Sequence, residues 1–139
     1  MLKEEKIIKL ILPENKLAEV LIELYEEAPD DEDMIMLKVN IEHQERSYIS
    51  DSYFEALEKF RQDLEEKNIQ IIFNGSALNV YPSPMALSMG SGQLAYKLNF
   101  GKQALTKDLV EIFDCDETLT FVSILEQRKF YEDWLKSLR

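Results

Sequence analysis

The chain has 139 residues, of which 45% are hydrophobic and 31% are charged, and its formal net charge is −11. This length fits one domain, and this hydrophobic fraction excludes an intrinsically disordered chain. The excess of acids argues against binding to nucleic acid or to an anionic membrane surface, because both reward lysine and arginine.

The ends of the chain carry no recognisable targeting signal. Glu4 and Glu5 are acidic where a secretory signal is basic, and Lys9 interrupts the short apolar run at residues 7–12. No stretch approaches the roughly 18 apolar residues of a membrane helix. The single cysteine, Cys115, excludes an internal disulfide. We therefore expect a cytoplasmic protein.

The first predicted element is a helix over residues 14–28. Pro13 suits a first helical turn, and Pro29 ends the pattern. The preceding residues 7–12 fit either a strand or a helical turn. The apolar residues that recur at helical spacing within the predicted helix are Leu17, Val20, Leu21, Leu24 and Ala28.

A half-buried strand and a second helix are expected next. Residues 34–42 alternate, with Ile35, Leu37, Val39 and Ile41 on one side, which is typical of a strand. A polar loop is predicted at residues 43–46. Ser50 or Asp51 then caps a helix to about residue 67. The predicted buried stripe of this helix is Tyr53, Phe54, Leu57, Phe60 and Leu64.

The middle of the chain has the pattern of a hairpin, a loop and two further strands. Asn74-Gly75 is a strong turn signal between a strand at residues 69–73 and a return strand at residues 78–81. Pro82 and Pro84 end regular pairing, and residues 83–92 fit a loop with one helical turn at 85–89. Strands are predicted at residues 94–100 and 109–113.

The last element is a capped helix that ends near residue 137. Ser123 and Glu126 have the spacing of a capping box. The sum is an α+β fold in a single domain over residues 1–139: an antiparallel sheet of four to five strands packed with about three helices. The predicted apolar face of the last helix is Ile124, Phe130, Tyr131, Trp134, Leu135 and Leu138.

The acids are concentrated near the N-terminus. Residues 14–33 hold nine acids and one base, which accounts for −8 of the net charge. A solvated helix face explains this simply, but like charges at helical spacing cost stability, which favours an acidic surface for a basic partner. The candidate partner-binding residues here are Glu19, Glu23, Glu26, Glu27, Asp30, Asp31 and Asp33.

A second asymmetry is the absence of Asp and Glu from residues 69–107. A buried hairpin explains part of it, but residues 81–93 are rich in Pro, Ser and Gly, which is typical of an exposed recognition loop. Methionine adapts to the shape of a partner, so Tyr81, Met85 and Met89 are predicted as the apolar anchors of an interface.

No catalytic or metal-binding motif stands out. The only histidine, His43, has no motif spacing to Ser91, and the acid clusters at residues 30–33 and 114–117 lack the pattern of a calcium loop. The aspartates on both sides of Cys115 disfavour its thiolate. We expect a protein that is not an enzyme and that binds no metal and no cofactor.

Three blocks of sequence have the character of family signatures: residues 79–83 (NVYPS), 89–96 (MGSGQLAY) and 130–135 (FYEDWL). In size, charge, α+β pattern and absence of catalytic motifs, the chain resembles the small acidic immunity proteins that bacteria pair with toxins. The resemblance implies tight binding to a toxin, at its active site or beside it. Such toxins are often basic nucleases, which fits the acidic segment.

These observations predict an immunity or inhibitor protein that neutralises a basic protein partner, and they leave a homodimer open. Two alternatives remain. One is a small enzyme or ligand-binding domain that uses residues 81–93, where apolar and polar side chains alternate. The other is a phage-encoded inhibitor of a bacterial defence protein, which physical features of the sequence do not separate from an immunity protein.

Overall fold

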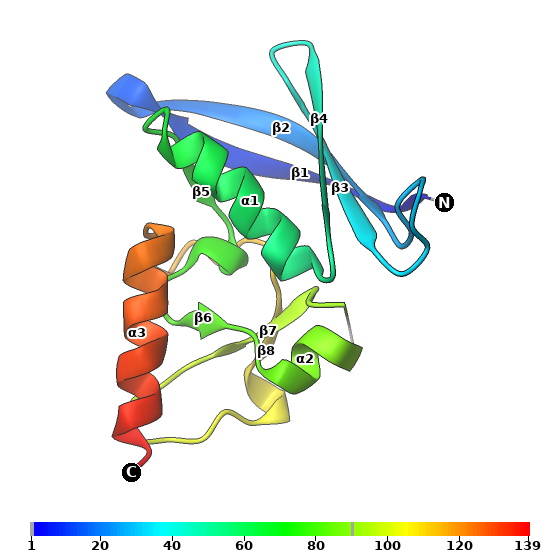
Figure 1. Ribbon diagram of the computed structural model, residues 1–139. Coiled ribbons are helices and arrows are strands. Elements are labelled where there is room, and N and C mark those ends of the chain that lie inside the picture. The colour runs from blue at the N-terminus through cyan, green and yellow to red at the C-terminus, as the bar shows by residue number, and fades with distance from the viewer. Residues whose placement is uncertain (1, 90) are drawn as a thin grey trace.

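The computed structural model describes residues 2–89 and 91–139, apart from the side chains of Ser88 and Met89, and within them two antiparallel sheets and three α-helices (Figure 1). The α+β class is confirmed, although one sheet was expected. The larger sheet has the order β4-β3-β2-β1-β5 and the smaller one the order β6-β7-β8. The strands are β1 (Leu2–Leu12), β2 (Lys16–Tyr25), β3 (Ile35–Ile41), β4 (Gln44–Ser50), β5 (Gln70–Ile72), β6 (Val80–Tyr81), β7 (Leu94–Lys97) and β8 (Leu109–Glu111), and the helices are α1 (Tyr53–Glu65), α2 (Pro84–Met89) and α3 (Ile124–Ser137).

The predicted helix over residues 14–28 is wrong, because this segment forms β2 and pairs antiparallel with β1. The inward residues Ala18, Val20, Ile22 and Leu24 recur every second position, and the outward Leu17 and Leu21 are exposed. The helical spacing arose because apolar residues stand on both faces of the strand. The open question at residues 7–12 is settled in favour of a strand.

The strand predicted at residues 34–42 is confirmed as β3, with Ile35, Leu37 and Val39 buried on the predicted side. The polar loop predicted at residues 43–46 is wrong. Glu42 and His43 have positive φ angles of 52° and 67° and turn the chain, and β4 starts at Gln44. β4 lies at the edge of the sheet, where polar side chains are compatible with pairing to one neighbour.

Helix α1 covers the inner face of the larger sheet. Its N-cap is Ser52, whose hydroxyl accepts a hydrogen bond from the amide of Glu55, so Ser50 and Asp51 do not cap it. All five predicted stripe residues are buried. The core therefore lies between α1 and the inward side chains of β1, β2 and β3.

The hairpin predicted around Asn74-Gly75 is wrong. β5 pairs with β1, residues Asn74–Ser76 form a short 3-10 turn, and β6 pairs with β7 of the other sheet. A Cβ atom at Gly75 would lie 2.6 Å from the Leu57 side chain, so the turn needs glycine to pack against α1. The burial of residues 73–77 explains part of the acid-free stretch.

The helical turn predicted at residues 85–89 is confirmed as α2, and the strands predicted at 94–100 and 109–113 are present as the shorter β7 and β8. The capping box of α3 is also confirmed, with Ser123 and Glu126 bonded reciprocally. Its apolar face differs from the prediction: Ile124 and Trp134 are buried, but Leu135 and Leu138 are exposed. None of the helices within the described residues is long and apolar enough to span a membrane.

A buried polar tie joins α1 to α3. The Arg61 guanidinium donates to Gln127 Oε1 at 2.6 Å, to the carbonyl of Val122 at 2.9 Å and to that of Gly75 at 3.3 Å. Gln127 Nε2 donates in turn to three backbone carbonyls, each at 2.9 Å. Both side chains are buried, and burial lowers the pKa of Arg61 to about 10. These three carbonyls belong to Gly75, Ala77 and Val80.

The variant Gln127→Leu should therefore destabilise the fold strongly. It removes one of the three acceptors of the buried Arg61 guanidinium and the side-chain donor to three buried carbonyls, and we expect the free energy of unfolding to fall by about 3 kcal/mol. Chemical denaturation measures this loss. The exposed Gln62→Leu on α1 serves as the control and should stay within about 0.5 kcal/mol of wild type. A loss below about 1 kcal/mol for Gln127→Leu would contradict the role of the tie.

Candidate functional site

An apolar hollow of the surface lies between β6, α2, β7 and α3 and has a volume of about 480 Å³. We call it the aromatic groove. Four aromatic residues and two prolines make its walls largely apolar, and no lining residue is charged. The lining residues are Tyr81, Pro82, Ser83, Pro84, Met85, Tyr96, Leu98, Gln103, Ala104, Tyr131 and Trp134.

Three elements hold the aromatic side chains of the groove. Tyr81 and Tyr96 face each other across the β6–β7 pair. The Tyr81 ring stacks on the Tyr131 ring of α3, with centroids 4.2 Å apart and planes 17° apart, and Tyr131 lies 6.0 Å from Trp134. Behind Tyr81, the edge of Phe54 from α1 contacts its ring at 5.2 Å. The walls are thus fixed by packing on both sides.

The floor of the groove continues into α2. The hydroxyl of Ser83 accepts a hydrogen bond from the amide of Ala86, and Pro84 occupies the first position of the helix, which suits a residue without an amide proton. Met85 is 64% exposed at the rim, and Pro82 is buried. The expectation of an exposed Met85 on this segment is confirmed. The side chain of Met89 lies outside the described part of the chain.

Charged groups of α1 and α3 border the groove. Arg128 forms an ion pair with Glu58 at 2.7 Å. Burial, followed by the negative charge of Glu58, raises the pKa of Tyr81. A second hollow of about 510 Å³ between α1 and α3 is lined by three glutamates, Glu55, Glu58 and Glu65, and by the bases Lys59 and Arg128. The Glu58–Arg128 pair thus lines this second hollow, and its charges also act on the pKa of Tyr81 in the groove.

Most of the predicted acidic candidates lie in the loop between β2 and β3. Glu26, Glu27, Asp30, Asp31 and Asp33 belong to this loop, and all five are exposed. Hydrogen bonds within the loop shape it. Among them, the amide of Ala28 donates to the carbonyl of Met34 at 2.8 Å, and that of Asp33 to the Asp31 carboxylate at 2.9 Å.

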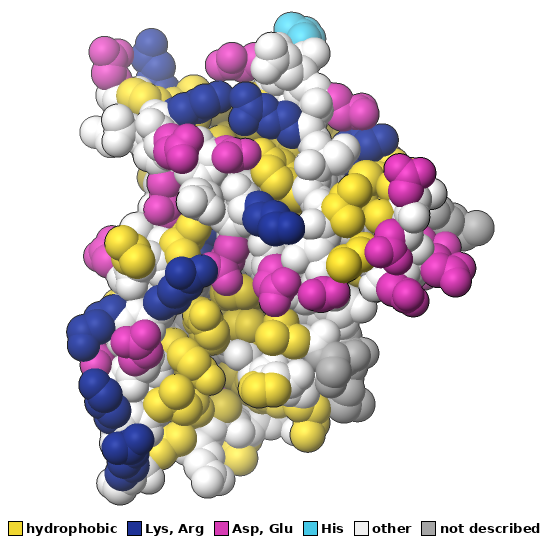
Figure 2. Space-filling view, in the orientation of Figure 1, with side chains coloured by type: hydrophobic (Ala, Val, Ile, Leu, Met, Phe, Trp, Pro, Cys, Tyr) yellow, Lys and Arg dark blue, Asp and Glu magenta, His cyan; other side chains and the backbone are white. Residues whose placement is uncertain are grey.

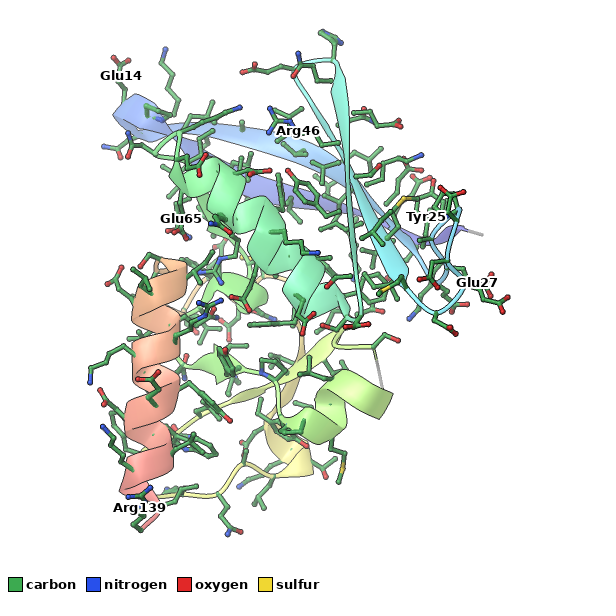
Figure 3. All side chains as sticks on the ribbon, viewed as in Figure 1. Glu14, Tyr25, Glu27, Arg46, Glu65 and Arg139 are labelled. Atoms are coloured by element: carbon green, nitrogen blue, oxygen red, sulfur yellow. The ribbon has the colours of Figure 1, made fainter. Side chains whose placement is uncertain are left out.

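The acidic loop lies near the start of α1. Burial, followed by the charge of Glu26, raises the pKa of Tyr53 to about 12. Glu27, labelled in Figure 3, lies at the end of the larger sheet opposite to Glu14, which marks the tip of the β1–β2 hairpin. The two acidic ends of this segment are therefore far apart.

Glu19 and Glu23 do not share a helix face with Glu26 and Glu27, because all of this segment up to Tyr25 is a strand. They point to the outer face of the sheet. Glu19 stands opposite Lys9 in the register, and Glu23 accepts a hydrogen bond from the Tyr25 hydroxyl at 2.9 Å. The predicted crowding of Glu19, Glu23, Glu26 and Glu27 on one helix face is thus wrong, because the first two lie in β2 and the last two in the loop after it.

One face of the molecule brings most of the predicted acids and the groove together. Figure 2 shows acidic side chains over the β2–β3 loop and near the start of α1, and hydrophobic side chains gathered between α2 and α3. Tyr81 and Met85 belong to the second group. Tyr96, Tyr131 and Trp134 were not predicted as site residues, because only the β6–β7 pairing and the placement of α3 bring them to Tyr81.

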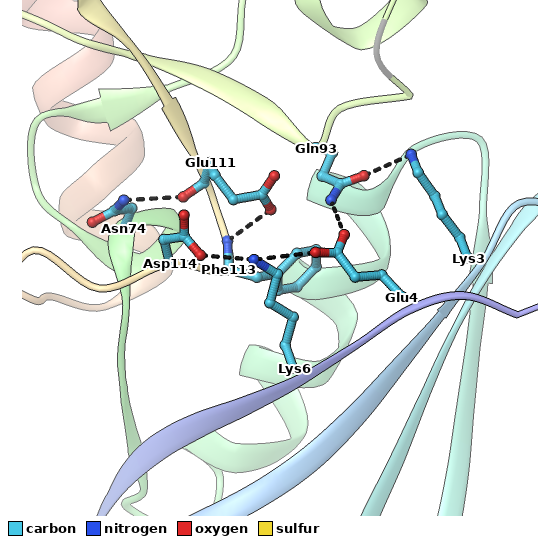
Figure 4. A network of polar contacts seen from close by, with 8 residues as sticks. All are labelled: Lys3, Glu4, Lys6, Asn74, Gln93, Glu111, Phe113 and Asp114. Atoms are coloured by element: carbon cyan, nitrogen blue, oxygen red, sulfur yellow. Dashed lines mark hydrogen bonds and ion pairs between the residues drawn. The ribbon is translucent and has the colours of Figure 1, made fainter.

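A second polar cluster joins β1 to the smaller sheet (Figure 4). Lys6 Nζ lies 2.7 Å from Asp114 and 3.3 Å from Glu4, and Gln93 bridges Lys3 and Glu4 at 2.8 and 2.9 Å. Its groups satisfy one another, so we interpret the cluster as a structural connection between the sheets.

Glu111 lies in the same cluster, with its carboxylate accepting a hydrogen bond from the amide of Phe113 at 3.3 Å. Burial raises the pKa of Glu111, although this hydrogen bond and the charge of Lys6 lower it in part. Ionisation of Glu111 is therefore less favourable in the folded protein than in the unfolded chain.

The other candidates weighed in the sequence do not assemble into a centre. His43 is exposed in the β3–β4 turn. Partial burial and the charge of Glu117 raise the pKa of Cys115. The direction agrees with the prediction from its acidic neighbours, although burial contributes most. Within residues 2–89 and 91–139, no three His, Cys, Asp or Glu side chains are grouped to hold a metal ion.

Comparison with known proteins gives no family for the chain. No family model matches the sequence, and no curated protein is similar to it at a significant level.

The variant Met85→Ser should leave the fold intact. The side chain is 64% exposed at the rim of the groove, and surface changes of this kind cost under about 1 kcal/mol of unfolding free energy. Thermal and chemical denaturation measure this. Tyr131→Ala, which removes the ring stacked on Tyr81, should cost more than Met85→Ser. A markedly lower melting temperature for Met85→Ser would place this side chain in the core.

The variant Glu111→Gln should raise the melting temperature at pH 7. A carboxyl whose pKa is raised by folding contributes stability at low pH, and this contribution is lost as the pH rises through the folded-state pKa. The advantage of the variant should therefore shrink as the pH falls below the ordinary value of 4.5. Glu32→Gln removes the same charge from an exposed loop and serves as the control. An equal effect of both variants would contradict the prediction.

Proposed function

We propose that this chain is a non-catalytic binding protein that captures a basic protein partner, in the manner of an immunity or inhibitor protein. The observation that carries the proposal is the arrangement of one face, which presents both the aromatic groove and a strongly acidic loop. Acidic side chains attract the partner and orient it, and the groove receives an apolar or aromatic side chain from it.

The two parts of this surface have different physical roles. Exposed ion pairs are worth about 0–1 kcal/mol each, so the loop alone does not give a tight complex. It does raise the rate of encounter, because a concentrated field steers a partner of opposite charge. The aromatic groove supplies the desolvated contact, since the stacked rings of Tyr81 and Tyr131 are already held in place before binding.

Removal of acids from the loop should slow association. The variant Glu26→Gln/Glu27→Gln has two charges fewer beside the start of α1, and we expect its association rate constant at low salt to fall by about tenfold. The control Glu14→Gln/Glu42→Gln removes the same charge at two turns of the sheet, the first at the end opposite to Glu27. It should change the rate far less.

The partner for this measurement is recovered from the native source with the wild-type chain as bait, identified, and purified. Surface plasmon resonance over a series of salt concentrations then gives both rate constants. The proposal is contradicted if the recovered partner is acidic, or if its association is insensitive to salt and equal for the two double variants.

Truncation of a side chain at the groove should raise the dissociation rate constant. Met85→Ser removes an exposed thioether at the rim, and we expect the complex to dissociate about tenfold faster with little change in association. The control is Leu17→Ser, which truncates an apolar side chain that is 73% exposed on β2, near the tip of the β1–β2 hairpin. A Met85→Ser complex that dissociates like the wild type would exclude the groove from the interface.

A further inference from the structure

The groove opens beside a basic corner that is unusual in so acidic a chain. From Lys97 to Lys107 the sequence has three lysines and no acid, although the net charge of the chain is −11. These lysines line a hollow of about 450 Å³, together with one carboxylate, that of Asp108. The lining thus carries three positive charges and one negative charge.

The basic hollow and the aromatic groove are neighbours, because Gln103 lines both of them. The indole of Trp134 holds the segment between them. Its Nε1 donates to the carbonyl of Asn99 at 3.0 Å and to that of Lys102 at 3.1 Å. The backbone amide of Gly101 donates to the Ser137 hydroxyl at 2.8 Å. The lysine-bearing turn is therefore fixed against α3, and its lysines line the hollow that adjoins the groove at Gln103.

The acids near the lysines compensate them only in part. Lys97 lies 3.9 Å from the Asp116 carboxylate, at the outer limit of an ion pair. The carboxylate of Asp108 accepts a hydrogen bond from the amide of Leu105 at 3.0 Å, which ties it to its own turn. Lys102 and Lys107 are exposed beside these groups. An anion in this hollow would meet an excess of positive charge.

We infer that the groove and the basic hollow together form a binding site for a small molecule that has an aromatic ring and an anionic oxygen group, either a carboxylate or a phosphate. The ring lies among Tyr81, Tyr131 and Trp134, and the anionic oxygens lie near the lysines. Two hollows of about 480 and 450 Å³ are within the size of small-molecule sites. Lysine ammonium groups recognise either anion as point charges. The inference does not depend on the proposed protein partner.

The position of Trp134 makes the site directly observable. It is the only tryptophan of the chain, it lines the groove, and its indole bonds to the lysine-bearing turn, so its fluorescence reports on this part of the molecule. We would titrate the protein with phenyl phosphate, phenylacetate, neutral benzyl alcohol and inorganic phosphate. Calorimetry measures the affinity of each, and Trp134 emission locates the binding.

We expect at least one aromatic anion to bind about tenfold or more tightly than both benzyl alcohol and inorganic phosphate, with a change in Trp134 emission. The stronger of phenyl phosphate and phenylacetate identifies the anionic group. The variant Lys102→Gln/Lys107→Gln should lose this advantage. Lys16→Gln/Lys67→Gln, which removes two other exposed lysines, should keep it.

Several results would overturn the inference. One is equal affinity for the aromatic anions and benzyl alcohol, and another is equal affinity for phenyl phosphate and inorganic phosphate. A third is no binding of either aromatic anion at millimolar concentration, or binding without a change in Trp134 emission. The fourth is that the Lys102→Gln/Lys107→Gln variant, with an unchanged melting temperature, still binds the aromatic anion more tightly than benzyl alcohol and inorganic phosphate.

Discussion

The buried guanidinium of Arg61 has to find its hydrogen-bond acceptors inside the protein, because burial removes it from water. Its acceptors are the Gln127 side chain and the carbonyls of Gly75 and Val122, so α1, the 74–76 turn and α3 are held in one arrangement. A tie built on neutral acceptors keeps the helices together without a buried carboxylate. The position of α3 sets the positions of Tyr131 and Trp134. The groove therefore depends on the hydrogen bonds of Arg61 and Gln127.

The surface that we associate with function separates its charges from its apolar contact. The acids gather on the β2–β3 loop and at the start of α1, the aromatic groove lies between α2 and α3, and three lysines line the hollow that adjoins the groove at Gln103. Such an order gives a bound segment or molecule a direction as well as an affinity. The groove itself has no charged lining residue, which lets rings pack without the cost of desolvating a charge.

The sequence predicted local structure where one signal dominated. The stripe of α1 and the capping box of α3 are local patterns, and the structure confirms both. The prediction for residues 14–28 was wrong because their apolar residues fit both the helical and the strand period. Only the pairing of β1 with β2 selects the strand. The same limit applies to the site: Tyr81 and Met85 were found from composition, whereas Tyr96, Tyr131 and Trp134 join them through long-range packing.

The order of the strands has a consequence for how the chain folds during synthesis. β1, β2, β3 and β4 are neighbours both in sequence and in the sheet, so they can pair as soon as they leave the ribosome. Their inward side chains, such as Leu10, Val20 and Leu37, stay uncovered until α1 is complete. Before that moment the nascent meander exposes a wide apolar face and an open edge, a state that aggregates easily. The N-terminal half therefore has the greatest need of a chaperone while the rest of the chain is still being made.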